Sequence, residues 1–198
     1  RSKTVSYFGD GIKAKGNSPT KHYYDYGLIN QEAFQHELLK TCKGIQWLNE
    51  TAKLIKSENK ISEVICSSGL KLKARLVIDA SGHKSKFIKR PFLKEVAQQA
   101  AYGIVGKFST PPVKKDQFVL MDFRSDHLED EELLKSPSFL YAMDLGSETY
   151  FVEETSLASY PSFSQDHLKK RLLSRLNSKG IKVVEIFHEE NCLFPMNL

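Results

Sequence analysis

Short runs of apolar and β-branched residues, separated by turns rich in Gly, Pro and Ser, constrain the fold of this chain more than any other feature. Runs of this length and composition are typical of β-strands. Apolar residues at helical spacing stand out in two stretches, which follow Asn30 and Ser164, and both of these residues can cap a helix. The order of the patterns predicts an α+β, or mixed α/β, protein in which an antiparallel sheet dominates the second half.

The expected helices and strands can be placed by residue number. Asn30 should cap a helix that continues to about Cys42, and a second helix should cover residues 165–178, where leucines recur at helical spacing. Residues 1–27 should form a loop or a short hairpin. The run Leu76-Val77-Ile78 has no polar alternation and predicts a fully buried strand. The expected strands are 45–48, 52–56, 61–66, 70–78, 98–108, 118–122, 139–144, 150–155 and 181–187.

Composition places the chain among globular proteins. Its 198 residues are 40% hydrophobic and 27% charged, and its 12 Phe and 8 Tyr supply more apolar surface than a disordered chain contains. No run of about 18 apolar residues occurs, so no transmembrane helix is expected. The three cysteines, Cys42, Cys66 and Cys192, lack metal-ligand spacing, and their odd number favours a reducing intracellular compartment over a disulfide framework.

The net charge of +5 is unevenly distributed. Eight basic residues and one acid lie between Lys71 and Lys94, whereas six acids lie between Asp122 and Glu132. The basic stretch could contact phosphate, nucleic acid or an anionic membrane surface, or it could be only a solvated face. Because no nucleic-acid-binding motif accompanies it, no nucleic-acid partner is expected.

The first candidate site is the turn Asp79-Ala80-Ser81-Gly82, which follows the predicted buried strand and precedes Ser85. Small residues let the backbone approach a ligand closely, and exposed N–H groups in such a turn can hold a phosphate. A tight turn without a ligand explains the same residues equally well. The dinucleotide fingerprint G-x-G-x-x-G does not occur in the sequence.

The second candidate is a pair of adjacent acids, Glu153 and Glu154, at the end of a strand pattern rich in aromatic and β-branched residues. Neighbouring side chains of a strand point to opposite faces, so Glu153 should share a face with Phe151 and Thr155. Only one glutamate should then look into an apolar cavity. Burial there would raise the pKa of its carboxyl group and keep it protonated, as a general acid requires. The alternative is the end of an edge strand with two solvated acids.

The third candidate combines two acids, a base and a histidine, which are Asp122, Arg124, Asp126 and His127. Charged side chains this close in sequence could form an ion-pair network or the rim of a site, and a surface turn held by local ion pairs is the alternative. His127 has no Cys or His at metal-ligand spacing, so no metal is assigned. No serine lies in the context of a nucleophile elbow, so a serine hydrolase has no support.

Motifs spread over nearly the whole chain share their order with those of one enzyme family. They are Tyr26-Gly27-Leu28-Ile29, Leu38-Leu39, Cys42, Leu76 to Gly82 with Ser85, Ala101 to Ile104, Val119 to Leu128, Ser138 to Met143, Phe151 to Leu157, Gly180 to Val183, and Pro195-Met196. Together they resemble the plant and cyanobacterial lycopene cyclases, which are flavin-dependent carotenoid cyclases.

The resemblance implies the glutathione-reductase-like flavoprotein fold, close to that of p-hydroxybenzoate hydroxylase, with an FAD/NAD(P)-binding part and a mostly antiparallel substrate sheet. It divides the chain into residues 1–97, part of the FAD-binding domain, residues 98–160, the substrate-domain sheet, and residues 161–198, a helix and strand that return towards the FAD-binding domain. The chain begins with Arg1, and the family's first and last flavin-binding segments are not in it. We therefore expect the central part of a longer cyclase, which neither holds FAD nor is active by itself.

The implied activity is that of an isomerase, an intramolecular lyase that closes the linear ψ ends of lycopene or another linear carotene into β or ε rings. In the family an acid protonates the terminal double bond, the neighbouring alkene attacks the cation, and loss of a proton fixes the ring double bond. The carboxyl pair of the F-L-E-E-T motif corresponds to Glu153 first and Glu154 second as acid–base residues, with Phe151 beside the substrate.

The remaining site residues follow from two further family motifs. Asp122, Arg124, Asp126 and His127 resemble the M-D-W-R-D motif, with Phe123 in place of Trp, and are implied to bind substrate. The turn of Asp79, Ala80, Ser81 and Gly82 resembles the second flavin-side motif. The implied cofactor is reduced FAD, kept reduced by NADPH.

A lipid-resident hydrocarbon substrate implies peripheral contact with a photosynthetic membrane, in a cyanobacterium or a plastid. Three alternatives stay open. A flavoprotein monooxygenase or a carotenoid epoxide-rearranging synthase would use the same fold, and a catalytically dead binding or scaffold module would keep the fold without the cofactor.

Overall fold

The computed structural model of the chain describes residues 2–7, 19–82, 85–89 and 96–196. Two compact units are present. One contains Arg1–Leu28 and Lys94–Leu198, and the other contains Ile29–Leu93. The predicted boundaries at residues 97 and 160 divide the chain by function, into flavin-binding and substrate-binding parts, and not into compact units. These boundaries stay predictions.

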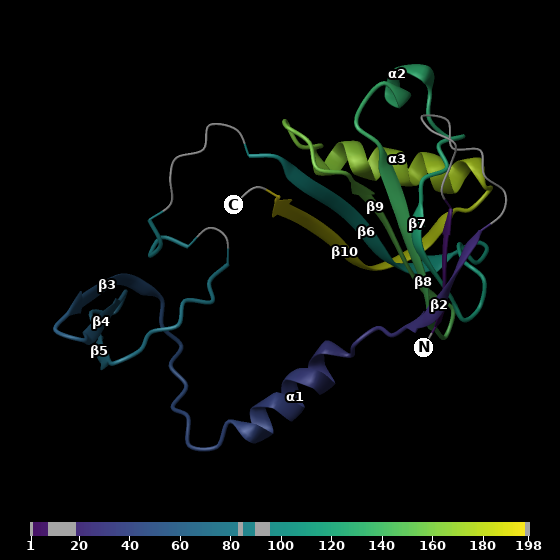
Figure 1. The fold of residues 1–198 in the computed structure, drawn as a ribbon. Helices are drawn as coiled ribbons and strands as arrows, with labels where there is room; N and C mark the ends of the chain where they lie inside the picture. The colour runs from purple at the N-terminus through teal and green to yellow at the C-terminus, as the bar shows by residue number, and fades with distance from the viewer. Residues whose placement is uncertain (1, 8–18, 83–84, 90–95, 197–198) are drawn as a thin grey trace. The chain divides into compact units, whose positions relative to one another are not determined.

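A seven-stranded sheet forms the larger unit (Figure 1). Its strands are β1 (Ser2–Tyr7), β2 (Thr20–Tyr26), β6 (Gln98–Phe108), β7 (Gln117–Asp122), β8 (Ser138–Gly146), β9 (Thr149–Ser156) and β10 (Val183–Pro195). They lie in the order β10-β6-β9-β8-β7-β1-β2, and every pair is antiparallel except β1 with β7. The predicted mixed class with a mainly antiparallel sheet is therefore confirmed.

Helix α3 (Gln165–Ser178) packs on one face of this sheet. Ser164 begins the helix as its N-cap by accepting a hydrogen bond from the backbone N–H of His167 at 3.2 Å. The side chains of Leu168, Leu172 and Leu176 are buried in the core shared with the sheet, and each contributes about 2 kcal/mol by leaving water. The helix has the bounds that its leucine spacing predicts.

The other helices are shorter. Helix α2 (Asp130–Leu133) belongs to the larger unit and α1 (Gln31–Thr41) to the smaller one. None of the helices in the described ranges combines the length and the hydrophobicity needed to cross a bilayer.

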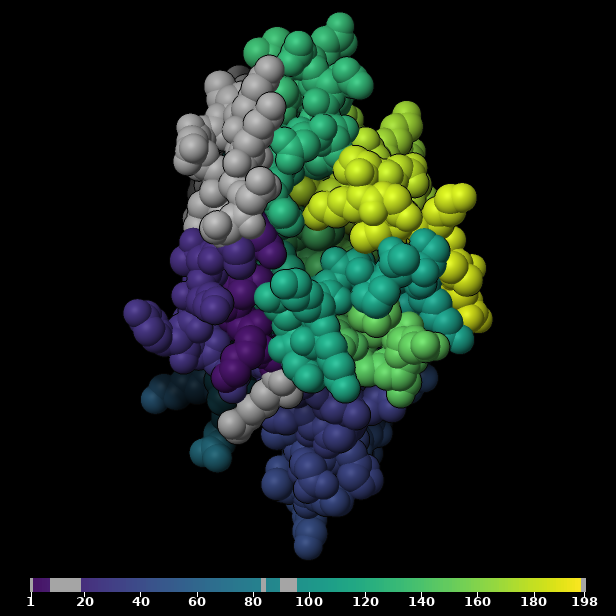
Figure 2. All heavy atoms as spheres, turned by 90° about the vertical axis from the view of Figure 1, so that its right-hand side faces the viewer, coloured from purple at the N-terminus to yellow at the C-terminus, as the bar shows by residue number. Residues whose placement is uncertain are grey.

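Of the loop and the short hairpin predicted for residues 1–27, the described residues favour the hairpin. β1 and β2 pair antiparallel, and β1 also joins the large sheet through its parallel pairing with β7. This second pairing has no local sequence signal, because it links segments that are far apart in the chain. β2 is an edge of the sheet, and its purple atoms lie at the surface in Figure 2.

The smaller unit contains α1 and a three-stranded antiparallel sheet of β3 (Ala52–Glu58), β4 (Ile61–Cys66) and β5 (Lys71–Ala74). Asn30 begins α1 as predicted, because its side chain accepts the backbone N–H of Ala33 at 2.9 Å. No residue of α1 is buried.

One predicted strand of the smaller unit is wrong, and another, 70–78, is confirmed only in part, as β5. Residues 45–48 form no strand, and Leu76-Val77-Ile78, predicted to be fully buried, lies beyond the end of β5 with Leu76 and Ile78 74% and 80% exposed. An apolar run shows which residues could be buried, but a buried strand also needs a paired strand on each side. Among the described residues, none pairs with residues 76–78 as a strand.

Candidate active site

Glu153 and Glu154 point to opposite faces of the large sheet. β9 lies between β6 and β8, so Glu153 is level with Gly103 and Tyr141, and Glu154 is level with Tyr102 and Leu140. The alternation predicted for this strand is confirmed. The alternative of an edge strand with two solvated acids is wrong, because β9 is an interior strand and Glu154 is fully buried.

Glu153 faces an apolar cavity of about 450 Å³ on the side of the sheet opposite α3. Neighbouring aromatic rings form part of its wall, with 4.1 Å between the centroids of the tilted rings of Tyr26 and Phe118 and 6.0 Å between those of the stacked rings of Phe118 and Tyr141. A cavity of this size and lining suits a hydrocarbon segment better than a polar ligand. Its lining residues are Tyr26, Leu28, Val105, Phe118, Leu120, Tyr141, Met143, Leu145, Phe151, Glu153 and Glu190.

The environment of Glu153 favours the protonated carboxyl group. Burial, together with the negative charge of Glu190, raises its pKa above the usual value, although a hydrogen bond of 2.8 Å from the Thr155 hydroxyl acts in the opposite direction. Phe151 lies on the same face and lines the same cavity, as predicted. A raised pKa beside an apolar cavity suits an acid that delivers a proton to an alkene.

Glu190 and Cys192 on β10 are close to Glu153, and neither was a candidate from the sequence. The two carboxyl groups and the thiol lie within 4.8 Å of one another. Burial and the carboxylate of Glu190 raise the pKa of Cys192 to about 12, which opposes the thiolate form that a metal ligand requires. The sequence signal that could have found them is their spacing of two, which puts both on one face of a strand.

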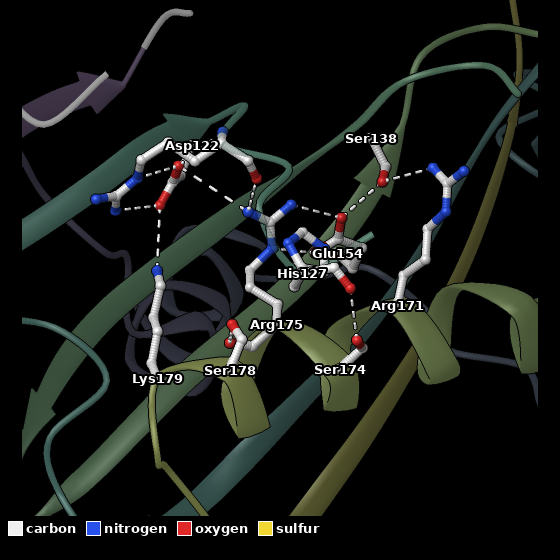
Figure 3. Close-up of polar contacts among 10 residues, drawn as sticks. Asp122, His127, Ser138, Glu154, Arg171, Ser174, Arg175, Ser178 and Lys179 are labelled. Atoms are coloured by element: carbon white, nitrogen blue, oxygen red, sulfur yellow. Dashed lines mark hydrogen bonds and ion pairs between the residues drawn. The ribbon is translucent and has the colours of Figure 1, made fainter. Parts of the chain in front are cut away.

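On the other face, Glu154 is held by Arg175 and Ser138 (Figure 3). Arg175 donates from Nε to Oε2 and from Nη2 to Oε1, both at 2.8 Å, and the Ser138 hydroxyl donates to Oε1 at 2.6 Å. Burial alone would raise the pKa of Glu154, but the charge and hydrogen bonds of Arg175 more than offset it and hold the pKa below its usual value. These contacts give Glu154 a structural role, and its predicted acid–base role stays a prediction.

The arginines of α3 carry this network, and the sequence expectations missed them. Arg171 and Arg175 lie four residues apart on the face that also carries the buried leucines. Arg171 donates to the Ser138 hydroxyl at 2.9 Å and to the carbonyl of Ser136 at 3.1 Å. Cations inside an apolar helical stripe are the signal that could have revealed a buried acidic partner.

Asp122 and His127 join Glu154 on the α3 side (Figure 3), and Arg124 pairs with Asp122. Arg124 donates to Asp122 from Nε at 2.8 Å and from Nη2 at 2.5 Å, and Lys179 donates to the same carboxylate at 3.4 Å. Although burial alone would raise the pKa of Asp122, these cations lower it. Burial, with the charge of Arg175, lowers the pKa of His127 to about 4.

The predicted substrate-binding set is thus divided between the two faces. Phe151 lies beside Glu153, whereas Asp122 and Arg124 form an ion pair on the other side of the sheet, where His127 also lies. The exposed Asp126 adjoins this group in sequence. Substrate binding by these five residues stays a prediction, and their contacts give Asp122 and Arg124 a structural role first.

The predicted flavin-side turn closes on its own aspartate. Asp79 accepts the backbone N–H of Ser81 at 3.0 Å and its hydroxyl at 2.6 Å, and it also accepts the hydroxyl of Ser85. Gly82 has a φ of +88°, which favours glycine, and no atom lies within 4 Å of the position of a Cβ there. Asp79 thus shapes the turn through these contacts, and Ala80, Ser81 and Gly82 are exposed. Its role in cofactor binding stays a prediction.

Comparisons with known proteins place the chain in a family. The family model described as lycopene cyclase protein matches residues 4–198. The chain is 50% identical to the lycopene beta cyclase of Synechococcus elongatus over 100% of its own length and 47% of the relative's. It is 32% identical to the chloroplastic lycopene beta cyclase of Arabidopsis thaliana, covering 98% of this chain and 39% of the relative. The chain therefore spans less than half the length of these curated relatives.

Solved structures with low sequence identity share the fold. A geranylgeranyl bacteriochlorophyll reductase-like protein from Thermoplasma acidophilum matches with a TM-score of 0.61 and 14% identity, over 98% of this chain and 49% of that one. The halogenase PltM in complex with phloroglucinol and FAD matches with a TM-score of 0.58 and 11% identity, over 98% and 43%. The predicted flavoprotein-type fold is thereby confirmed, and the extent of the family match shows that the chain belongs to the lycopene cyclase family.

Proposed function

We propose that the protein carrying this chain is an isomerase that cyclises the linear ψ ends of lycopene, or of another linear carotene, to β rings. The observation that carries the proposal is Glu153, whose half-buried carboxyl group has a raised pKa and faces an apolar cavity. The beta cyclase names of the relatives support β rings over ε rings.

In the proposed reaction, Glu153 donates its proton to the terminal double bond and leaves a tertiary carbocation. The neighbouring alkene attacks this cation to close the ring, and a proton then leaves the ring to form the new double bond. The formula of the substrate is unchanged, as an isomerase requires. Phe151 and Tyr141 form part of the apolar wall, and the wall keeps water away from the cation.

Glu154 has a different proposed part. Its ion pair with Arg175 ties β9 to α3, so it fixes the strand on which Glu153 lies. A group whose pKa is lowered and whose oxygens are all engaged is a poor proton donor.

The proposed cofactor is reduced FAD, with NADPH as its reductant. When bound, the reduced flavin would supply electrostatic stabilisation of the cation without net redox change. The fold shared with an FAD-containing halogenase supports this proposal, and the backbone of Asp79, Ala80, Ser81 and Gly82 would contribute to its binding. We expect residues 1–198 to be inactive without the rest of the protein.

We also propose that the protein works at the surface of a photosynthetic membrane, in a cyanobacterium or a plastid. A hydrocarbon substrate resides in lipid, and the relatives include cyanobacterial and chloroplastic cyclases. The exposed lysines Lys71, Lys73, Lys86 and Lys89 could contribute weak attraction to anionic lipid. Arg75 in the same stretch is also exposed, and the remaining three basic residues, Lys84, Arg90 and Lys94, lie outside the described residues.

A second candidate is a carotenoid epoxide-rearranging synthase. It is supported by the 36% identity to a protein named neoxanthin synthase from Solanum lycopersicum, over 86% of this chain and 36% of that protein. Protonation by Glu153 would serve this reaction too, since opening an epoxide also begins with an acid.

The test is to express the full protein in a lycopene-accumulating bacterial strain and to analyse its pigments. We expect lycopene to be replaced by carotenes with β rings, while a strain that expresses residues 1–198 alone keeps its lycopene. Unchanged lycopene with the full protein would contradict the cyclase proposal. Conversion of an added epoxy-carotenoid, with lycopene untouched, would favour the second candidate.

A further inference from the structure

Glu153 and Glu190 face each other across a position without a side chain. β6 separates β9 from β10, and Gly103 on β6 is level with both acids. A Cβ on residue 103 would lie 2.9 Å from Cε2 of Phe151 and 3.3 Å from Cβ of Glu153. Glycine therefore leaves open the space through which the two carboxyl groups approach within 4.8 Å.

We propose that Glu190 is a positioning residue for the acid step, in which its carboxylate lies across Gly103 from Glu153 and its negative charge favours a proton on Glu153. This inference rests on the proposed cyclase function. Glu190 acts through Glu153, and Glu153 is the residue that reaches the alkene.

Cys192 fixes the position of the Glu190 carboxyl group. Its thiol donates a hydrogen bond of 3.2 Å to Oε1 of Glu190, and its raised pKa of about 12 keeps it a thiol at neutral pH. Burial and the negative charge of Glu190 both raise the pKa of Glu153. The proton of the pair is therefore expected on Glu153.

The groups that surround Glu153 agree with one proton for the pair. Thr155 on β9 donates a hydrogen bond to it, and Tyr141 on β8 stays a neutral phenol because burial raises its pKa. Glu190 and Cys192 face it from β10, and β6 contributes only Gly103 at this level. In the described part of the chain, the cavity lining has no basic side chain to neutralise a second negative charge. Two carboxylates so close together resist being ionised at the same time.

The pair also accounts for the return of the proton. The O–H bond of Glu153 breaks as a C–H bond forms at the alkene, and both carboxylates are then charged beside the cation. Their repulsion favours recovery of a proton when a C–H bond of the ring cation breaks. The pair ends with one proton, as it began, so the cycle needs no other reactant.

The test is the pH dependence of lycopene cyclisation by the full protein, with lycopene in lipid vesicles and flavin and reductant in excess. Glu190→Gln removes the charge and keeps the shape of the side chain. The negative charge of Glu190 favours the protonated form of Glu153, so Glu153 should lose its proton at a lower pH in this variant. The fall of activity at high pH should therefore occur about one pH unit lower than in the wild type. Glu189→Gln is the matched control, because it removes the same charge from the next residue of β10, which contacts Tyr102 and Lys169 on the opposite face. Its profile should coincide with that of the wild type.

The high-pH limb of the profile decides the outcome. If activity of Glu190→Gln falls at the same high pH as that of the wild type, the inference is overturned, whether or not the overall activity is lower. A purely structural role would change the overall activity but not the pH at which activity falls. If Glu190→Gln does not fold, Glu190→Asp decides in the same way, because it keeps the charge and should keep the limb near its wild-type position. A displaced limb in Glu190→Asp, with a normal thermal unfolding midpoint, would overturn the inference. An inactive wild type would instead refute the proposed function.

Discussion

Arg175 binds Glu154 through two hydrogen bonds of 2.8 Å, and both side chains are at most 2% exposed. The pair joins α3 to the interior strand β9 from the side opposite the cavity. Two charges buried in this way stabilise each other only while both are present. We expect this pair to help fix the position of Glu153, because Glu153 directly precedes Glu154 on β9.

Removing the cation of this pair should destabilise the larger unit strongly. Arg175→Met leaves the Glu154 carboxylate buried without its partner, and we expect a loss of about 3–5 kcal/mol in the free energy of unfolding. Urea denaturation of the full protein measures it, with Lys170→Met on the exposed side of α3 as control. The double variant Glu154→Gln/Arg175→Met should be more stable than Arg175→Met. Equal stabilities of Arg175→Met and Lys170→Met would contradict the buried-pair assignment.

His127 should make the protein less stable as the pH falls from about 6.5 to about 4. Its pKa in the folded protein is about 4, against an ordinary value of 6.5, so in this range the unfolded chain takes up a proton that the folded protein does not. We expect the free energy of unfolding to drop by about 2 kcal/mol more in the wild type than in His127→Gln.

Denaturation curves recorded at pH 7, 5.5 and 4 test this expectation. His36→Gln, at an exposed position of α1, should follow the wild type. The low pKa values of Asp122 and Glu154 should cause a further loss below the ordinary carboxyl range, in every variant. Parallel curves for the wild type and His127→Gln would refute the role given to His127.

Two glycines of β6 should respond differently to alanine. A Cβ on Gly106 would lie 2.1 Å from the backbone carbonyl oxygen of Glu185, so Gly106→Ala must disturb the pairing of β6 with β10 and should cost about 2–3 kcal/mol. The nearest atom to a Cβ on Gly103 is the edge of the Phe151 ring, which can move. Gly103→Ala should therefore cost less stability but displace the Glu153 carboxyl group, with at least about a tenfold loss of cyclisation. Thermal unfolding and turnover, measured on both variants, separate the two effects.

The cavity wall should contribute to binding rather than to chemistry. Leu120 is half-buried in the lining, and Leu120→Gln places an amide where a hydrocarbon chain is proposed to lie. We expect a roughly tenfold higher KM for lycopene with little change in kcat. Leu134→Gln, at a side chain that is 86% exposed next to α2, should leave both constants unchanged. A lower kcat with an unaltered KM would argue against a substrate-binding wall.

Local sequence signals predicted the elements that depend on local contacts. The Ser164 cap and the leucine spacing define α3, and strand alternation divides Glu153 from Glu154 correctly. Pairing between distant segments has no such signal, which explains why the parallel contact of β1 with β7 was not expected. The error at Leu76 to Ile78 has a related cause, since hydrophobicity cannot show whether pairing strands are present.

The candidate site was predicted in part for the same reason. Phe151 and Glu153 belong to one strand, so their common face could be predicted. Glu190 and Arg175 come from later elements and reach β9 only through the sheet order and the packing of α3. Motif resemblance groups Asp122 and Arg124 with substrate binding, which stays a prediction. In the structure Asp122 forms ion pairs with Arg124 and Arg175 on the α3 side of the sheet.

The central claim is that Glu153 supplies the proton that begins cyclisation. The most direct measurement is the turnover of lycopene by Glu153→Gln in the full protein, compared with Glu185→Gln at an exposed position of β10. Glutamine keeps the size of the side chain but cannot donate a proton to an alkene. Our account predicts a loss of at least about a hundredfold in Glu153→Gln, with wild-type turnover in Glu185→Gln and equal unfolding midpoints. Wild-type turnover by Glu153→Gln would contradict the account.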